Sequence, residues 1–188
     1  MPSSEESKTA EGLLAEDHEA LAKLLTALLA ALDEGDAVTV FARLDLFWAR
    51  LAMHIRAEHL HLFPAILRAL DGDPGERADK TAAPAEAREA IAQLHRDHDF
   101  FMHELAAAIK IMRDCRTKAG DDGATAIETV RQMIAKVRDR LEVHNQLEED
   151  MVYRWPAKLL APAEQTALAA QIRGEIRNLP PRFREEAD

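Results

Sequence analysis

Four long segments of this chain repeat apolar side chains in alternating steps of three and four, and this period constrains the fold more than any other feature. Such spacing places the apolar side chains along one face of an α-helix. Glycine is scarce, with 7 among 188 residues, and we find no alternating runs of β-branched residues that would favour strands. The sequence therefore predicts an all-α fold.

Breaks that contain glycine, proline and acidic residues divide the chain into helical segments. We expect helices over about 11–34, 37–70, 85–117, 124–155 and 163–178. Pro64 should kink the second helix or loosen the turn before it. Long helices joined by short breaks predict an up-down-up-down four-helix bundle with a short extra C-terminal helix. The expected organisation is a disordered tail over about 1–10, the bundle over 11–156, and the C-terminal helix and tail over 157–188.

The charge and the chain start exclude several classes of partner. The formal net charge is −10 and basic residues are interspersed with acidic ones, which argues against nucleic acid and anionic membrane surfaces. The opening "MPSSEESKTAEG" resembles neither a signal peptide nor a transit peptide. No apolar run approaches the ~18 residues of a membrane span. We therefore expect a cytoplasmic protein, whose single cysteine, Cys115, excludes an intrachain disulfide and a thiolate cluster.

We call the line of apolar side chains along each of the four long helices its seam. Each seam is interrupted by a histidine, or by a histidine and a glutamate. In "LEVHNQLEEDM", residues 141–151, the pair His144 and Glu148 occupies seam positions, while Glu149 and Asp150 should turn toward solvent. The complete set of polar seam residues is His18, His54, Glu58, His98, His144 and Glu148. An ionised carboxylate in an apolar core must be paired or bind a metal, or it becomes protonated. Because no Lys or Arg falls on these seams, bound cations are the expected compensation.

The two halves of the chain repeat this pattern. "EDHEALAKLL" (16–25) matches "RDHDFFMHEL" (96–105), and "LAMHIRAEHLHLF" (51–63) matches "LEVHNQLEEDMVY" (141–153). The aligned pairs are His18 with His98, His54 with His144, and Glu58 with Glu148. One His-x-x-x-Glu pair would be expected by chance, but two pairs at corresponding seam positions are informative. A duplicated helical hairpin would arrange its ligands around a pseudo-twofold axis.

Four imidazoles and two carboxylates suit iron, manganese or zinc, and two ions fit six ligands better than one. Carboxylates can bridge two ions in helical bundles. The alternative is a core network of satisfied His and Glu hydrogen bonds without metal.

The remaining histidines have weaker signals. His61 lies on the same helix face as Glu58. It is a candidate for an extra metal ligand or for a hydrogen-bond donor to a ligand, and the alternative is that it packs at the end of the bundle. His95 is a further candidate, although it and Asp99, four residues on, lie off the seam. We expect His59 at the periphery and His103 at the surface.

The ordered set of ligands resembles the hemerythrin-like, or HHE cation-binding, domain over roughly residues 13–156. "DHE" at 17–19 and "HLFP" at 61–64 are also typical of that family. The resemblance implies a four-helix up-and-down bundle around a non-haem di-iron centre. By this resemblance the two glutamates bridge the irons with an oxo or hydroxo group, and the four histidines are terminal ligands.

One departure separates the chain from oxygen-carrying hemerythrins. Those proteins use five histidines, including a His-x-x-x-His pair in the third helix, whereas Leu94 and Met102 flank His98 here. The chain is therefore closer to the four-His, two-Glu proteins of the iron-sulfur-cluster repair type. Reversible oxygen carriage would require His95 or His61 to supply the missing ligand.

The expected function is to bind or sense oxygen, peroxide or nitric oxide at a di-iron centre, or to handle iron in a stress response. The alternatives are a di-iron enzyme (a peroxidase, a nitric oxide reductase or an iron-sulfur cluster repair factor) and a metal-stabilised interaction module, with zinc or manganese in place of iron. Tyr153, the only tyrosine, lies five residues after Glu148 and so is rotated off its seam in a continuous helix. That position favours binding over redox catalysis.

Overall fold

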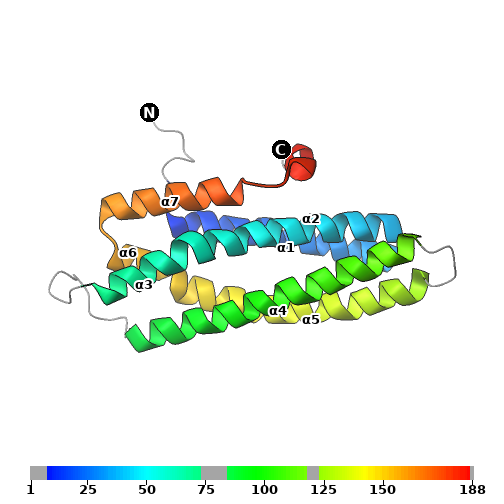
Figure 1. Cartoon of the computed structure of the whole chain (residues 1–188), viewed down its shortest axis with the longest axis horizontal. Helices are drawn as coiled ribbons and strands as arrows, with labels where there is room; N and C mark the ends of the chain where they lie inside the picture. The colour runs from blue at the N-terminus through cyan, green and yellow to red at the C-terminus, as the bar shows by residue number, and fades with distance from the viewer. Residues whose placement is uncertain (1–7, 73–83, 118–122, 187–188) are drawn as a thin grey trace.

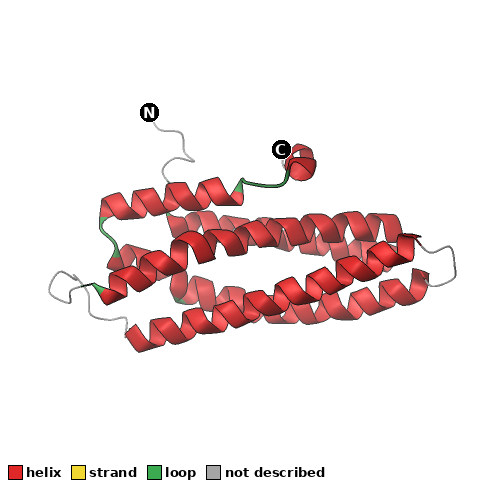
Figure 2. Ribbon diagram, in the orientation of Figure 1, coloured by secondary structure: helices red, strands yellow, loops and turns green. Residues whose placement is uncertain are grey.

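The computed structural model describes residues 8–72, 84–117 and 123–186, and this part of the chain is helical without strands (Figures 1 and 2). The elements are α1 (Ala10–Glu34), α2 (Ala37–Ala57), η1 (Glu58–Leu62), α3 (Phe63–Asp71), α4 (Pro84–Thr117), α5 (Gly123–Asp150), η3 (Val152–Arg154), α6 (Trp155–Leu159), α7 (Pro162–Ile176) and η4 (Pro181–Glu186). The predicted fold is confirmed: α1, the continuous segment α2–η1–α3, α4 and α5 form an up-and-down bundle, and α7 is the extra helix. The expected tail and two inter-helix loops fall largely outside the described residues. No helix within these ranges is long and apolar enough to cross a membrane.

Local side chains define the first helical hairpin. The Thr9 hydroxyl accepts a hydrogen bond from the Gly12 N–H at 3.1 Å and so begins α1. Gly35, with φ of 76°, ends α1 in the left-handed region that glycine adopts without strain. The Asp36 carboxylate then accepts the Thr39 N–H at 3.1 Å and begins α2. A break this short makes α1 and α2 antiparallel neighbours.

The turn before Pro64 is loosened, as predicted. Pro64 has no N–H to donate to the Leu60 carbonyl, so regular α-helical bonding cannot continue through it. The chain instead forms a π-helical turn over η1, in which the Phe63 N–H bonds to the Glu58 carbonyl. A π turn winds more slowly than an α turn, so a residue five positions later returns to the same face. Phe63 is thereby brought back over the face of Glu58.

The expected continuous helix to about residue 155 is wrong in its last turn. α5 ends at Asp150, and Met151 leaves helical geometry with φ of −128° and ψ of −65°. Pro156 cannot donate to the Val152 carbonyl, which accepts instead from the Trp155 N–H in a 3₁₀ turn. The fourth long helix therefore ends, and the chain changes direction, immediately after the segment that contains His144 and Glu148.

A polar layer divides the bundle interior into two apolar clusters. On α1, Leu14 belongs to one cluster and Leu21 to the other, with His18 between them. On α4, Leu94 and Phe101 are divided in the same way around the corresponding histidine. The helix α7 lies along α1 and α2 (Figure 1). The polar layer is thus enclosed by apolar side chains from above and below.

Candidate metal centre

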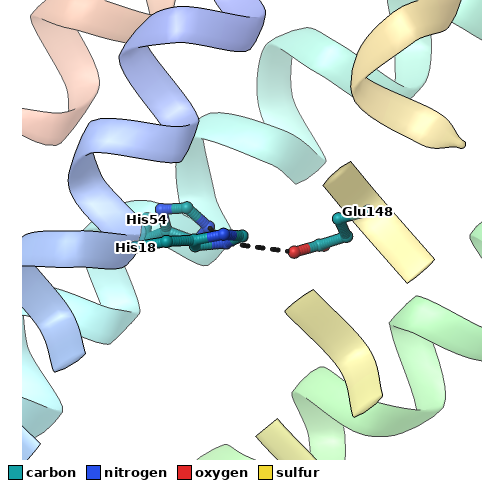
Figure 3. Close-up of side chains that lie close together, drawn as sticks. All are labelled: His18, His54 and Glu148. Atoms are coloured by element: carbon teal, nitrogen blue, oxygen red, sulfur yellow. Dashed lines mark hydrogen bonds and ion pairs between the residues drawn. The ribbon is translucent and has the colours of Figure 1, made fainter. Parts of the chain in front are cut away.

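The structure brings all six polar seam residues together in the buried layer. Their exposed fractions are His18 6%, His54 2%, Glu58 0%, His98 1%, His144 3% and Glu148 0%. Two groups have ligand atoms that all lie within 4.8 Å of one another: His18, His54 and Glu148, drawn in Figure 3, and His98, His144 and Glu148. These two buried His/His/Glu groups are consistent with a binuclear metal site. The individual ligand roles remain predictions.

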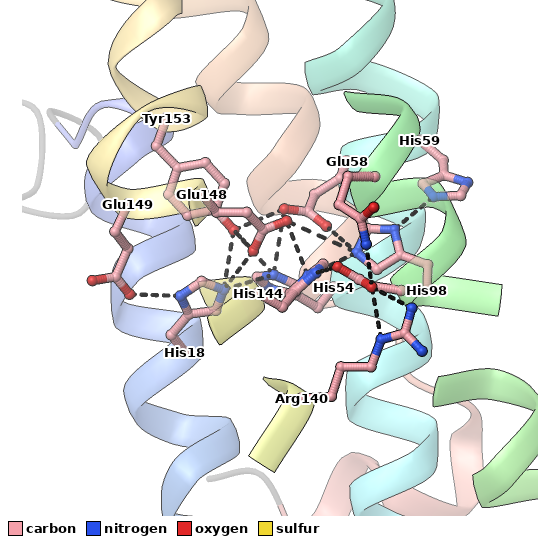
Figure 4. A network of polar contacts seen from close by, with 12 residues as sticks. His18, His54, Glu58, His59, His98, Arg140, His144, Glu148, Glu149 and Tyr153 are labelled. Atoms are coloured by element: carbon pink, nitrogen blue, oxygen red, sulfur yellow. Dashed lines mark hydrogen bonds and ion pairs between the residues drawn. The ribbon is translucent and has the colours of Figure 1, made fainter. Parts of the chain in front are cut away.

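We call His18, His54 and the carboxylate oxygens facing them the first half-site. The two Nε2 atoms are 3.2 Å apart, His18 Nε2 is 3.2 Å from Glu148 Oε2, and His54 Nε2 is 3.6 Å from Glu58 Oε1. Glu58 and Glu148 each direct their other oxygen to the opposite pair of histidines (Figure 4). Each carboxylate therefore faces both halves, which is the arrangement of a bridging ligand.

The second half-site consists of His98, His144 and the remaining carboxylate oxygens. The two Nε2 atoms are 3.1 Å apart. His98 Nε2 lies 3.2 Å from Glu58 Oε2, and His144 Nε2 lies 3.2 Å from Glu148 Oε1. The geometry repeats that of the first half-site, as the internal repeat predicts.

Buried aspartates orient one histidine in each half. His54 Nδ1 donates to Asp17 Oδ2 at 3.0 Å, and Arg50 holds the other Asp17 oxygen at 2.6 Å. His144 Nδ1 lies 3.4 Å from Asp97 Oδ2, and Arg140 Nε donates to Asp97 Oδ1 at 2.7 Å. An outward Nδ1–H leaves the Nε2 lone pair directed into the site, as metal ligation requires.

Sequence reasoning missed these orienting groups. The signal was present in the repeat, because an aspartate, Asp17 or Asp97, directly precedes each unpaired seam histidine. An arginine, Arg50 or Arg140, also lies four residues before the histidine of each His-x-x-x-Glu pair. The arginines are off the seam, as expected, but their long side chains reach the buried aspartates.

The other two seam histidines have different outer partners. Glu149 is exposed, as expected, but its Oε1 also accepts a hydrogen bond from His18 Nδ1 at 2.7 Å. His98 Nδ1 lies 2.8 Å from His59 Nε2, so His59 is not peripheral. Both contacts have one cause: each residue directly follows a seam glutamate, and its side chain is long enough to reach back to a neighbouring helix.

The donor atoms fit cations better than a closed hydrogen-bond network. With Nδ1 protons directed outward, the paired Nε2 lone pairs at 3.1 and 3.2 Å repel unless a proton or cation lies near them. Glu58 Oε2 and Glu148 Oε1 are buried without a hydrogen-bond partner in the described structure, which is costly in an apolar core. Donors about 2.1 Å from one ion lie about 3 Å from each other, close to most separations seen here.

In the absence of cations, protons take over part of their role. Burial lowers the pKa of His54, but the charge of Glu58 and hydrogen bonds to Asp17 and Glu58 raise it well above its usual value. Burial also opposes ionisation of Glu58, yet His54 and His98 hold the pKa of that carboxyl well below its usual value. Burial lowers the pKa of His144, but attraction to Glu148 and Glu58 and hydrogen bonds to Glu148 and Asp97 together raise it. Metal binding must therefore displace protons from these imidazoles.

Tyr153 lies inside the site, contrary to its expected place off the seam. Its side chain is buried and its hydroxyl lies close to four site atoms: 2.7 Å from Glu58 Oε1, 3.0 Å from Glu148 Oε2, 3.0 Å from His18 Nε2 and 3.2 Å from His54 Nε2. A continuous α-helix would rotate a residue five positions on by about 140° from its seam. The break at Met151 and the following 3₁₀ turn bring the phenol back to the site.

The remaining histidines lie around the six rather than among them. His61 points to α7, with Nε2 4.0 Å from Glu175 Oε2. The His95 ring packs against His59, with centroids 4.3 Å apart, on the outer side of the second half-site. His103 is exposed, as predicted.

The family model described as the Hemerythrin HHE cation binding domain matches residues 9–156. This match includes the six seam residues and Tyr153, and it ends before α7. No curated protein and no solved structure matches the chain.

Proposed function

We propose that this chain, which belongs to the hemerythrin HHE cation-binding family, is a non-haem di-iron protein that binds or senses oxygen, peroxide or nitric oxide. The observation that carries the proposal is the position of Glu58 and Glu148, each with one oxygen toward each pair of histidines. Two carboxylates placed in this way suit two ions that share ligands. Mixed imidazole and carboxylate donors suit iron, and zinc and manganese are the competing metals.

The residues of the chain would hold iron and control access to it. The four Nε2 atoms bind, and Asp17 and Asp97 orient one imidazole in each half. The two apolar clusters exclude bulk water on both sides of the layer, which favours small uncharged ligands over large polar ones. When bound, iron would supply exchangeable coordination positions and one-electron chemistry.

A di-iron enzyme is the second candidate function, and Tyr153 favours it. A phenol hydroxyl 2.7 Å from Glu58 Oε1 is a proton donor inside the site, which a peroxidase or a nitric oxide reductase could use. The four-His, two-Glu set also suits an iron-sulfur cluster repair factor. A metal-stabilised interaction module would require no open position on the metal.

The first experiment measures metal stoichiometry and spectrum. Anaerobic reconstitution with ferrous iron should load about two ions per chain, as expected for a carboxylate-bridged pair. Oxidation should then produce the near-ultraviolet charge-transfer absorption of a bridged ferric pair. Parallel titrations with zinc and manganese test metal preference. Fewer than one iron per chain would contradict the di-iron proposal.

Rapid mixing separates the candidate functions. The reduced, iron-loaded protein is mixed separately with oxygen, hydrogen peroxide and nitric oxide, and its absorption is followed with time. A stable one-to-one adduct supports a binding or sensing protein, whereas repeated consumption of the reagent supports an enzyme. An unchanged spectrum with all three reagents would favour the interaction module.

A further inference from the structure

We propose that Tyr153 is a fifth protein ligand of the ion held by His18 and His54, and that exogenous ligands bind the ion held by His98 and His144. This inference rests on the proposed di-iron function. It concerns how the two metal positions differ, which family membership alone does not determine.

The Tyr153 oxygen has more polar neighbours than its single hydroxyl proton can hydrogen-bond. Four site atoms lie within 3.2 Å of it, two from imidazoles and two from carboxylates. A phenol has one proton and donates to one acceptor at a time. Once His18 and His54 have lost their inward protons to bind metal, all four neighbours are acceptors. A cation among them converts these repulsive contacts into bonds from a common set of ligands.

The oxygen is also placed as a ligand rather than as an outer neighbour. Its separations from the four donors are 2.7 to 3.2 Å, similar to the 3.2 Å between His18 and His54 Nε2. Atoms that share one ion at about 2.1 Å have such spacing, whereas a group hydrogen-bonded behind a single ligand does not. Coordination replaces the phenol O–H bond with an oxygen–metal bond, and the proton is released to solvent.

Phe63 occupies the corresponding position in the second half of the repeat. It lies five residues after Glu58, as Tyr153 lies five after Glu148. Its ring stacks against His98 with centroids 6.1 Å apart and an interplanar angle of 14°, and it has no donor atom. The second half-site therefore has four protein donors where the first has five.

The glutamate oxygens also differ between the two half-sites in their contacts. Glu58 Oε1 and Glu148 Oε2, in the first half-site, both lie within hydrogen-bonding distance of the Tyr153 hydroxyl. Glu58 Oε2 and Glu148 Oε1, in the second half-site, lie 3.2 Å from His98 Nε2 and His144 Nε2, and no hydroxyl of the described chain hydrogen-bonds to them. With four protein donors instead of five, the second ion keeps an open position. Aromatic rings of Phe63 and Phe101 lie beside its histidines, which suits a small diatomic molecule or azide.

Resonance Raman spectroscopy of the ferric protein tests the tyrosine ligand directly. Because Tyr153 is the only tyrosine, any tyrosinate vibration enhanced in a visible charge-transfer band belongs to it. We expect this signal in the wild-type protein and its loss in Tyr153→Phe with two irons retained. Wild-type protein that loads two irons without the tyrosinate signal would overturn this inference and leave the di-iron proposal standing. Failure to load iron at all would instead contradict the proposed function.

Azide provides the second readout. Azide should bind one ion of the ferric wild-type pair, and Tyr153→Phe should double the azide stoichiometry by opening a position on the first ion. Phe63→Tyr is the reciprocal variant and should block azide while adding a second tyrosinate signal. Unchanged azide binding in both variants would overturn the assignment of the open position. If one variant fails to fold, the other variant and the wild-type Raman spectrum still decide the outcome.

Discussion

The two half-sites share their orienting groups. Asp17 and Arg50 hold His54 in the first, and Asp97 and Arg140 hold His144 in the second, at matching positions of the repeat. Rigid helices carry these residues in both halves, so duplication of the sequence also duplicates the geometry. The shared part of the site is therefore the part that would position the two proposed ions.

The half-sites differ most at residues that follow the glutamates. Glu149 contacts His18 in the first half-site, whereas its counterpart His59 contacts His98 in the second. Burial, and then the nearby charges of His98 and His95, lower the pKa of His59 to about 4, so it is neutral at physiological pH. The first half-site thus has an anionic outer partner and a phenol, and the second has a neutral imidazole and Phe63. This difference supports the proposal that the first half-site holds its ion firmly and the second leaves its ion accessible.

Removing a glutamate that faces both half-sites should cause the loss of both metal ions, which is the largest expected effect. In Glu148→Ala, both pairs of histidines lose a carboxylate oxygen, so we expect both ions to be lost. At metal concentrations 100 to 1,000 times the Kd, each lost ion would remove about 3–4 kcal/mol of unfolding free energy, or about 5–8 kcal/mol for both. Elemental analysis and thermal unfolding, with and without chelator, measure both effects. Glu142→Ala, an exposed position on the same helix, is the control, and retention of one full ion would show that the halves load independently.

Removing an orienting aspartate should act on one half only. Asp17→Asn should weaken the first ion and Asp97→Asn the second, each by about 10- to 100-fold, as for other outer partners of ligating histidines. Competition with a chelator of known affinity gives the two stepwise constants. Asp139→Asn, at an exposed position on α5, is the matched control. Equal weakening of both ions by either variant would contradict the division into half-sites.

Much of this arrangement could be predicted from periodicity alone. Five of the six seam residues lie within continuous α-helices and Glu58 directly follows α2, so a step of three or four still determines the face. The residues that prediction missed lie where a side chain reaches back or the helix changes its winding. Pro64 and Pro156 each predict a disturbed turn, but not that one becomes a π turn and the other a 3₁₀ turn. The position of Tyr153 follows from that difference and could not be read from residue spacing.

Proton competition should affect the first half-site more than the second. The pKa of His54 is raised well above 6.5 by Glu58 and Asp17 against the effect of burial, and that of His144 is raised less markedly. Protonated His54 stabilises the metal-free fold fully below about pH 6.5, and this stabilisation is lost as pH rises through the raised pKa. Metal affinity should increase up to about tenfold per pH unit for each displaced proton. Unfolding midpoints of loaded and metal-free protein should therefore diverge above pH 6.5, and constant separation between pH 6 and 8 would contradict the assignment.

Replacing His59, the hydrogen-bond partner of His98, should have the smallest effect on the difference between the two half-sites. His59→Glu would give the second half-site a carboxylate like Glu149, which makes the His98 imidazole a stronger donor to its ion. Because position 59 is half-buried, solvent screens much of the added charge, and we expect the second ion to bind tighter by about 0.5–1 kcal/mol, roughly a two- to fivefold change. His59→Gln keeps a neutral acceptor and separates charge from hydrogen bonding. If both variants change the stepwise constants alike, charge at this position does not distinguish the two ions, and the difference between them rests on Tyr153 and Phe63 alone.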